Sequence, residues 1–148
     1  MCSPRRFGLD PDRPLSKAPR HGHNRWHPDI EPIATVAPGE ELVLSTRDGG
    51  DGQITPTSTR ARDVAFDIAA LHPLVGPFFV EGAAPGDLLD VDILEIEPSS
   101  FGWAGVWPGG GGLMRTYVTE PLIAKFTITE GVARSPDLPG IAVRGRRT

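Results

Sequence analysis

Two copies of one turn-and-strand unit constrain this chain more than any other feature. The sequence A-P-G-E-E-L-V-L at 37–44 returns as A-P-G-D-L-L-D-V at 84–91. In each copy the proline fixes φ at the first central position of a turn, and the glycine accepts the positive φ that a type II turn needs next. A chain that reverses and then alternates apolar with polar residues predicts stacked β-hairpins.

The second copy leads into a predicted strand that runs to Glu97. Residues 89–93 alternate apolar and acidic side chains, the period-two pattern of a strand with one buried face. The apolar positions then change parity at residues 94–96, so the strand either carries a bulge or is buried on both faces. Glu81 stands just before this turn, whereas the first copy has no acid at the same place.

Glycine and proline limit the helix content of this chain. The 148 residues include 18 glycines and 16 prolines, about twice their average usage. The predicted fold is therefore mainly β, sandwich-like or barrel-like, and loop-rich with little helix. Further expected elements are strands at 33–36, 41–46, 77–80 and 122–128, a short strand from Ile141, a helical turn capped by Asp67, and an aromatic, glycine-rich loop at 101–112.

The N-terminus differs in composition from the rest. Residues 1–20 are rich in proline and arginine and lack an apolar period, which predicts a flexible basic arm; residues 21–148 are expected to form one β domain. The net charge of −4 and pI of about 5.5 disfavour a nucleic-acid partner. No apolar run or signal-like start is visible, so we expect a cytoplasmic protein away from membranes. The single cysteine, Cys2, excludes a disulfide framework.

Two polar segments offer candidate metal ligands. The segment 21–29 holds three of the four histidines: His23 could pair with His27 at helical i, i+4 spacing or with His21 on one side of an extended segment, although exposed loop histidines would look the same. In the run from Asp48 to Gln53, Asp48 and Asp51 are close enough to share a cation, although the run also reads as a flexible turn. Thr59 occupies the position where an EF-hand would need glutamate, so this run is not an EF-hand.

Several segments together resemble the acetamidase/formamidase family, hydrolases that release ammonia from short amides. The similar pieces are 23–30 with Pro32, 48–54, 76–77, 80–83 with 85–87, 108–109 with Leu113, and 119–121. The resemblance covers residues 21 to 143 and implies a mainly β fold, metal-assisted hydrolysis and a homo-oligomer. Family members are considerably longer, so the chain resembles a truncated N-terminal half.

Roles can be assigned to the family-like positions by chemical reasoning. His23, Asp48 and Asp51 are candidate ligands of a divalent cation, zinc first and calcium as the alternative. Such a cation would activate water and polarise the amide carbonyl. Gln53 is expected to orient the amide. Glu81, if desolvated beside its apolar neighbours, would be the general acid/base.

Three functions remain open from the sequence. The first is a metal-dependent hydrolase of short linear amides, or its N-terminal half. The second is a catalytically incomplete fragment that acts as a β module and binds a partner or a longer relative. The third is a small ligand-binding β domain that uses Trp103 and Trp107.

Overall fold

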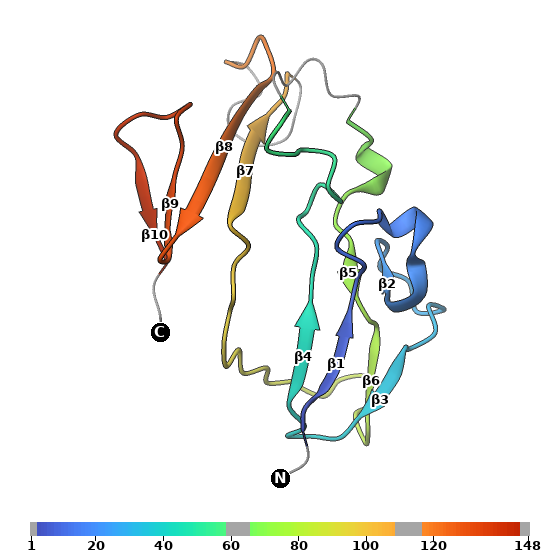
Figure 1. The fold of residues 1–148 in the computed structure, drawn as a ribbon. Helices are drawn as coiled ribbons and strands as arrows, with labels where there is room; N and C mark the ends of the chain where they lie inside the picture. Colours follow the sequence, from blue (N-terminus) through green and yellow to red (C-terminus); the bar gives the residue numbers. More distant parts are fainter. Residues whose placement is uncertain (1–2, 59–65, 109–116, 146–148) are drawn as a thin grey trace. The chain divides into compact units, whose positions relative to one another are not determined.

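The computed structural model describes residues 3–58, 66–108 and 117–145 (Figure 1). The chain divides into two compact units. Unit 1 comprises Met1–Gln53 and Asp67–Val91, and unit 2 comprises Ile54–Phe66 and Asp92–Thr148. Each unit is built from short strands and turns. The predicted mainly β, loop-rich class is confirmed.

Unit 1 contains three two-stranded sheets. Their strands are β1 (Arg5–Gly8) parallel to β4 (Leu42–Ser45), β2 (Gly22–His23) antiparallel to β5 (Leu74–Val75), and β3 (Ala34–Val36) parallel to β6 (Phe78–Val80). Three single turns of 3₁₀ helix accompany them: η1 (Leu15–Lys17), η2 (Pro19–His21) and η4 (Ile68–Ala70). The expected cap of η4 is confirmed, because the Asp67 carboxylate accepts from the Ala69 N–H at 2.8 Å.

Side chains link these small sheets to one another. The Arg5 guanidinium on β1 donates to the Thr35 carbonyl on β3 at 2.9 Å and to Glu40 at 3.0 Å. Phe7 on β1 meets Phe78 on β6 edge-to-face, with 5.1 Å between ring centroids. An edge-to-face aromatic pair stabilises the fold by more than the burial of its apolar surface alone. Unit 1 is therefore tied together by contacts between its sheets as well as by their ladders.

The N-terminal segment differs from the flexible arm that the sequence suggested. Residues 5–8 form β1, and Leu9 and Leu15 are among the few buried apolar side chains of the described chain. The partner of β1 is β4, more than thirty residues later. The local sequence of residues 1–20 has no apolar period, so it does not indicate a strand that forms by pairing with a segment so distant in the sequence.

The two turn-and-strand copies have different outcomes. In the first, the Glu40 N–H bonds to the Ala37 carbonyl and the chain continues into β4, as predicted. In the second, the turn also forms, with Asp87 N–H bonding to the Ala84 carbonyl at 3.0 Å. The strand predicted from there to Glu97 is absent from the described chain, and this prediction is wrong for the present structure. A strand needs a hydrogen-bonded neighbour, and this segment has none here.

Unit 2 is a four-stranded antiparallel sheet in the order β10-β9-β8-β7. Its strands are β7 (Phe101–Val106), β8 (Leu122–Thr129), β9 (Val132–Arg134) and β10 (Ala142–Arg144). The predicted strand at 122–128 is confirmed as β8, and the strand expected from Ile141 corresponds to β10.

The predicted aromatic loop at 101–112 is wrong for its first half. Residues 101–106 form β7, in which Trp103 lies opposite Lys125 of β8. Phe66, Trp103 and Trp107 form an aromatic cluster, with Phe66 stacked on Trp107 at 4.7 Å between centroids. Glycines at 102 and 105 suggested a loop, but pairing with β8 overrides that local preference. Residues 109–112 lie outside the described residues.

We predict that Gly22→Ala destabilises unit 1. A Cβ at this position would collide with the Leu9 side chain and lie 2.7 Å from the Leu74 carbonyl oxygen. Overpacking of this kind lowers the free energy of unfolding by about 1–3 kcal/mol. Urea denaturation should show the loss. Gly49→Ala is the matched control, because its nearest neighbour would be 3.8 Å away; an equal loss in both variants would contradict the packing argument.

Candidate functional site

Residues 67–72, which contain η4, form a junction where several candidate segments meet. We call this segment the η4 junction. Its backbone is bound by side chains from the histidine-rich segment and from the loop at 48–53, all within unit 1. The segments 23–30 and 48–54 carry the family resemblance, and residues 67–72 lie shortly before a third such piece at 76–77. The structure thus brings together residues up to 45 apart in the sequence.

Gln53 fastens the 48–53 loop to the η4 junction. Its Oε1 accepts from the Asp67 N–H at 2.6 Å, while its Nε2 donates to the Asp67 carbonyl at 3.1 Å and to the Gly50 carbonyl at 2.9 Å. A primary amide has two donors and an acceptor oxygen. In this structure both ends of the Gln53 amide are engaged with the backbone. Gln53 therefore positions the loop and the junction.

The histidine-rich segment also contacts the η4 junction. The Asn24 side chain donates to the Ala69 carbonyl at 2.7 Å, and Arg25 donates to it at 3.1 Å. His23 lies on β2 opposite Leu74 of β5. Its Nδ1 is 2.8 Å from the Arg25 carbonyl oxygen. Because a carbonyl can only accept, Nδ1 carries the proton, and in the neutral ring Nε2 carries the lone pair.

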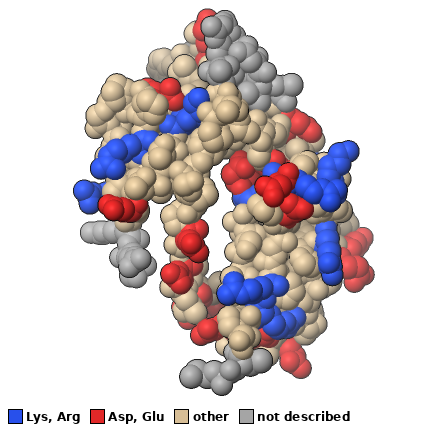
Figure 2. Space-filling model, viewed as in Figure 1, with Lys and Arg blue, Asp and Glu red and all other residues tan. Residues whose placement is uncertain are grey.

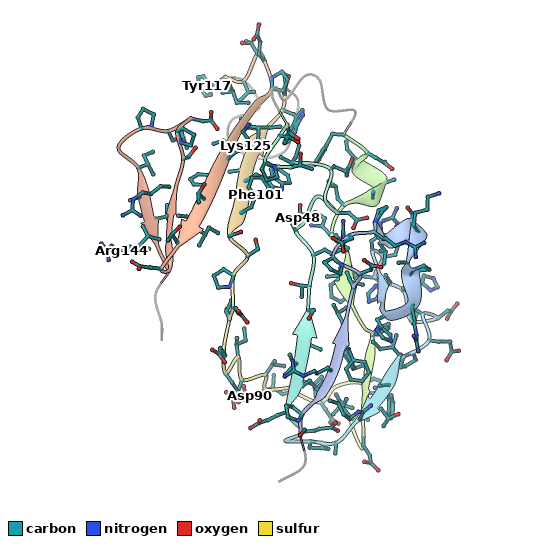
Figure 3. The ribbon with its side chains drawn as sticks, in the orientation of Figure 1. Asp48, Asp90, Phe101, Tyr117, Lys125 and Arg144 are labelled. Carbon is teal, nitrogen blue, oxygen red and sulfur yellow. The ribbon has the colours of Figure 1, made fainter. Side chains whose placement is uncertain are left out.

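The Asp48 carboxylate folds back on its own loop (Figure 3). Its Oδ1 accepts from the Gly50 N–H at 2.9 Å, and its Oδ2 accepts from the Gly52 N–H at 2.8 Å. Aspartate commonly bonds the backbone a few residues ahead of itself in turns. Gly52 has φ of +77°, and a Cβ there would lie 2.5 Å from the Arg47 guanidinium. The spacing of aspartates and glycines thus serves to close this loop.

Asp51 is buried and forms an ion pair with Arg47. Its Oδ1 lies 2.6 Å from Arg47 Nε, and its Oδ2 accepts from the Leu15 N–H at 2.8 Å. The Arg47 side chain is 9% exposed and that of Asp51 is 2% exposed. Arg47 also donates to the carbonyls of Asp10, Pro11 and Asp51 at 2.7–2.8 Å. The pair therefore ties the N-terminal segment to the 48–53 loop.

The predicted metal ligands do not form a metal centre in the described chain. No group of three His, Cys, Asp or Glu side chains lies close enough there to hold one ion. The Asp51 carboxylate is neutralised by a guanidinium, and both Asp48 oxygens accept backbone N–H groups. Of the three predicted ligands, His23 is the one whose bond through Nδ1 leaves Nε2 with a lone pair. As placed in the described chain, the three side chains do not gather around one point, and the cation stays a prediction.

Glu81 lies away from the η4 junction along the chain. It follows β6, its N–H bonds to the Val36 carbonyl at 2.9 Å, and its side chain is exposed. In Figure 1 the green helical turn η4 lies in the upper part of unit 1, whereas β6 lies in its lower part. The desolvation expected around this carboxylate is not present in the described chain.

Two residues of this region did not stand out in the sequence. Arg47 carries the buried ion pair, but a single arginine after a strand has no distinctive pattern. His72 follows η4 and precedes Pro73. It adopts φ of +58°, and its N–H bonds to the Gly49 carbonyl at 2.9 Å. A non-glycine residue in the left-handed region is uncommon and worth attention near a functional site. Its position before Pro73 favours an extended backbone, so the sequence carried no signal for this conformation.

The structure is that of a mainly β protein whose η4 junction gathers segments 23–25 and 48–53 on one backbone. The Acetamidase/Formamidase family model matches residues 8–148. The chain belongs to the acetamidase/formamidase family, as its sequence motifs predicted. In the described residues, no helix has the length and apolar character required to cross a membrane.

Individual relatives agree with this membership. An acetamidase of Mycolicibacterium smegmatis is 37% identical over 94% of this chain and 37% of its own length. A formamidase of Methylophilus methylotrophus is 42% identical over 66% of this chain and 25% of its length. The chain therefore spans between a quarter and two fifths of the curated relatives it matches here.

Solved structures give the same fold. A crystal structure of an acetamidase from Bacillus halodurans superposes with a TM-score of 0.74 at 23% identity, covering 94% of this chain and 42% of that one. A gamma lactamase from Delftia acidovorans superposes with a TM-score of 0.71 at 31% identity, covering 85% of this chain and 32% of that one.

We predict that Arg47→Met leaves Asp51 as an uncompensated buried charge. Removing one partner of a buried pair costs about 3–5 kcal/mol of unfolding free energy. Asp51→Asn should also destabilise, and the double variant should lose less than the sum of the two, with a coupling above about 1 kcal/mol. Denaturant unfolding of the four proteins measures this cycle. Additive losses would contradict a direct pairing.

We predict that Gln53→Ala loosens the η4 junction. Each lost hydrogen bond is worth about 1 kcal/mol, so the Asp67 amide should exchange with solvent about five- to tenfold faster. Hydrogen exchange followed by NMR measures this rate. The Leu9 amide, which donates to Ser45, is the internal control. An equal acceleration at Leu9 would show general destabilisation instead.

Proposed function

We propose that this chain is the N-terminal part of an amide hydrolase that acts on short linear amides such as formamide and acetamide and releases ammonia. Membership of the acetamidase/formamidase family supports the amide class of substrate. The observation that carries the proposal is the η4 junction, where family-like segments 23–25 and 48–53 are held on one backbone.

Within this proposal the residues of unit 1 have separate tasks. Arg47, Asp48 and Asp51 fix the shape of the 48–53 loop, and Gln53 fixes its attachment. His23 supplies an imidazole whose tautomer is set by the Arg25 carbonyl, so Nε2 can accept a proton or a ligand bond. Glu81 is the proposed proton-transfer residue. It precedes the second Ala-Pro-Gly turn, whereas the corresponding position before the first turn is Ala34.

Burial of Glu81 is a condition of that role. A carboxylate becomes an effective general acid/base near neutral pH when its surroundings are desolvated. The surroundings of Glu81 in the described chain are open to solvent. In the proposal, the covering surface comes from family sequence that has no counterpart in these 148 residues. The divalent cation, zinc or calcium, and the homo-oligomer also stay predictions for the assembled enzyme.

A second function is favoured by one observation. The segment 88–97 exposes its apolar side chains, which suits a β module that binds a longer relative. This reading agrees with the first if binding assembles the amidase. It becomes the alternative if binding occurs and no amide is hydrolysed.

A chimera tests the catalytic proposal. This chain replaces the matching N-terminal part of the M. smegmatis acetamidase, and ammonia release from formamide and acetamide is measured. We expect activity, and we expect Glu81→Gln to lower kcat by about 10²–10⁴-fold, the usual contribution of general acid/base catalysis. Glu41→Gln, an exposed acid in the first copy of the turn, should change kcat little.

Two further results bear on the same proposal. Chelation should abolish ammonia release, and added zinc should restore it if the cation prediction holds. Molar mass from light scattering reports the oligomer. A folded chimera that releases no ammonia, while the unmodified acetamidase does so in the same assay, would contradict the proposed function.

A further inference from the structure

His72 holds a backbone conformation that its own side chain and the next residue both disfavour. Its φ is +58°, in the left-handed region. The Cβ of any residue other than glycine makes this region costly, and a following proline, here Pro73, favours an extended backbone instead. Such a conformation persists only where the surrounding structure imposes it, and residues of this kind cluster at functional sites.

Two other non-glycine residues of the described chain have a positive φ, and each has a structural reason. Asp51, with φ of +53°, places its carboxylate in the buried ion pair with Arg47. Glu130 and Gly131, with φ of +51° and +71°, form the two-residue turn between β8 and β9, and positive φ is usual at both positions of such a hairpin turn. His72 is exposed and lies outside any hairpin turn of the described chain.

The end of η4 does not account for a histidine either. His72 follows Leu71, the C-cap of η4, at a place where glycine is the usual left-handed residue because it has no Cβ. The His72 N–H bonds to the Gly49 carbonyl at 2.9 Å, and the backbone of a glycine would make the same bond. An imidazole at this place therefore serves a purpose other than forming the turn.

The imidazole lies beside the 48–53 loop and is open to solvent. A Cβ built on Gly49 would lie 3.8 Å from His72 Nδ1, and Nε2 is beyond 4 Å from that point. In the part of the chain that the structure describes, no hydrogen bond engages this ring. A neutral imidazole has one N–H donor and one lone pair. His72 therefore presents an unused hydrogen-bonding group at the η4 junction, with Nε2 as the nitrogen farther from the loop.

The charges around the junction suit an uncharged ligand. Figure 2 shows acidic and basic side chains mixed over the visible face of unit 1, without a large area of one sign. At the junction itself, Asp67 accepts from the Ala69 N–H, Arg25 donates to the Ala69 carbonyl, and Asp48 closes its own loop. These charged groups are engaged with the backbone, so a neutral hydrogen-bonding ligand complements the imidazole better than an ion does.

We propose that His72 is a substrate-binding residue of the amidase, with Nε2 hydrogen-bonded to the amide group of a short neutral amide that lies beside the Gly49 turn. The left-handed backbone, held by the bond to Gly49, places the ring there. The inference rests on the proposed function, and it adds a residue to which neither the motifs nor the family membership assigns a role.

Two substitutions at this one position test the backbone requirement. His72→Gly and His72→Ala both remove the imidazole, but only glycine adopts φ of +58° without the penalty of a Cβ. We expect His72→Gly to unfold at a higher urea concentration than His72→Ala. Glu130→Gly and Glu130→Ala, at the hairpin turn, form the matched pair and should show the same order.

Acetamide is the probe for binding, which is measured without turnover by NMR on the 148-residue chain. We expect the ring signal of His72 to shift to saturation, whereas that of His27, an exposed imidazole, should not shift. Followed through the backbone signals of the 48–53 loop, His72→Gly should bind acetamide at least tenfold more weakly. Glu130→Gly should bind as the parent does. His72→Asn, which tolerates a positive φ and keeps a hydrogen-bonding side chain, should recover part of the loss.

The proposal is overturned if acetamide leaves the His72 signal unchanged, if His72→Gly binds acetamide as the parent does, or if His72→Ala is as stable as His72→Gly. Acetate is the charged comparison, and equal binding of acetate would overturn the assignment to a neutral amide. Ammonia release is measured separately in the chimera. A chain that binds acetamide through His72, together with a chimera that releases no ammonia, would sustain the binding residue and count against the proposed catalytic function.

Discussion

The buried ion pair between Arg47 and Asp51 is the interaction on which unit 1 depends most. Its two side chains are almost fully removed from solvent, and each is satisfied by further bonds to the backbone. A buried charge is tolerated only with such a partner and such bonds. Because those bonds reach residues 10, 11 and 15, the pair holds the N-terminal segment and the 48–53 loop in one arrangement.

The candidate site follows from that arrangement. The loop closed by Asp48 and Arg47 presents Gln53 to the η4 junction, and the junction in turn receives Asn24 and Arg25. The aspartates that resembled metal ligands thus shape the loop on which the site is built. Near this junction, the tautomer of His23 is set by its bond to the Arg25 carbonyl, which leaves Nε2 with a lone pair.

The described chain has few buried apolar side chains. It shares its fold with an acetamidase over 42% of that chain and with a gamma lactamase over 32% of that chain, and the apolar side chains that it buries are Leu9, Leu15, Val36, Ile54 and Val132. Strands that lack their neighbours cannot form ladders, and carboxylates that lack their cover stay hydrated. In the described chain, residues 88–97 have no hydrogen-bonded neighbouring strand and the Glu81 side chain is exposed.

The sequence by itself determined the family, the mainly β class, the Pro-Gly turns, the Asp67 cap and the strand at β8, because each depends on residues close together in the chain. Tertiary structure decided the rest. Pairing with distant residues made β1 from an apparently loose segment and β7 from an apparent loop. The fold also buries the Asp51 carboxylate against the guanidinium of Arg47, four residues earlier. The alternation at 88–97 specifies a strand, yet a strand exists only where a neighbour supplies its hydrogen bonds.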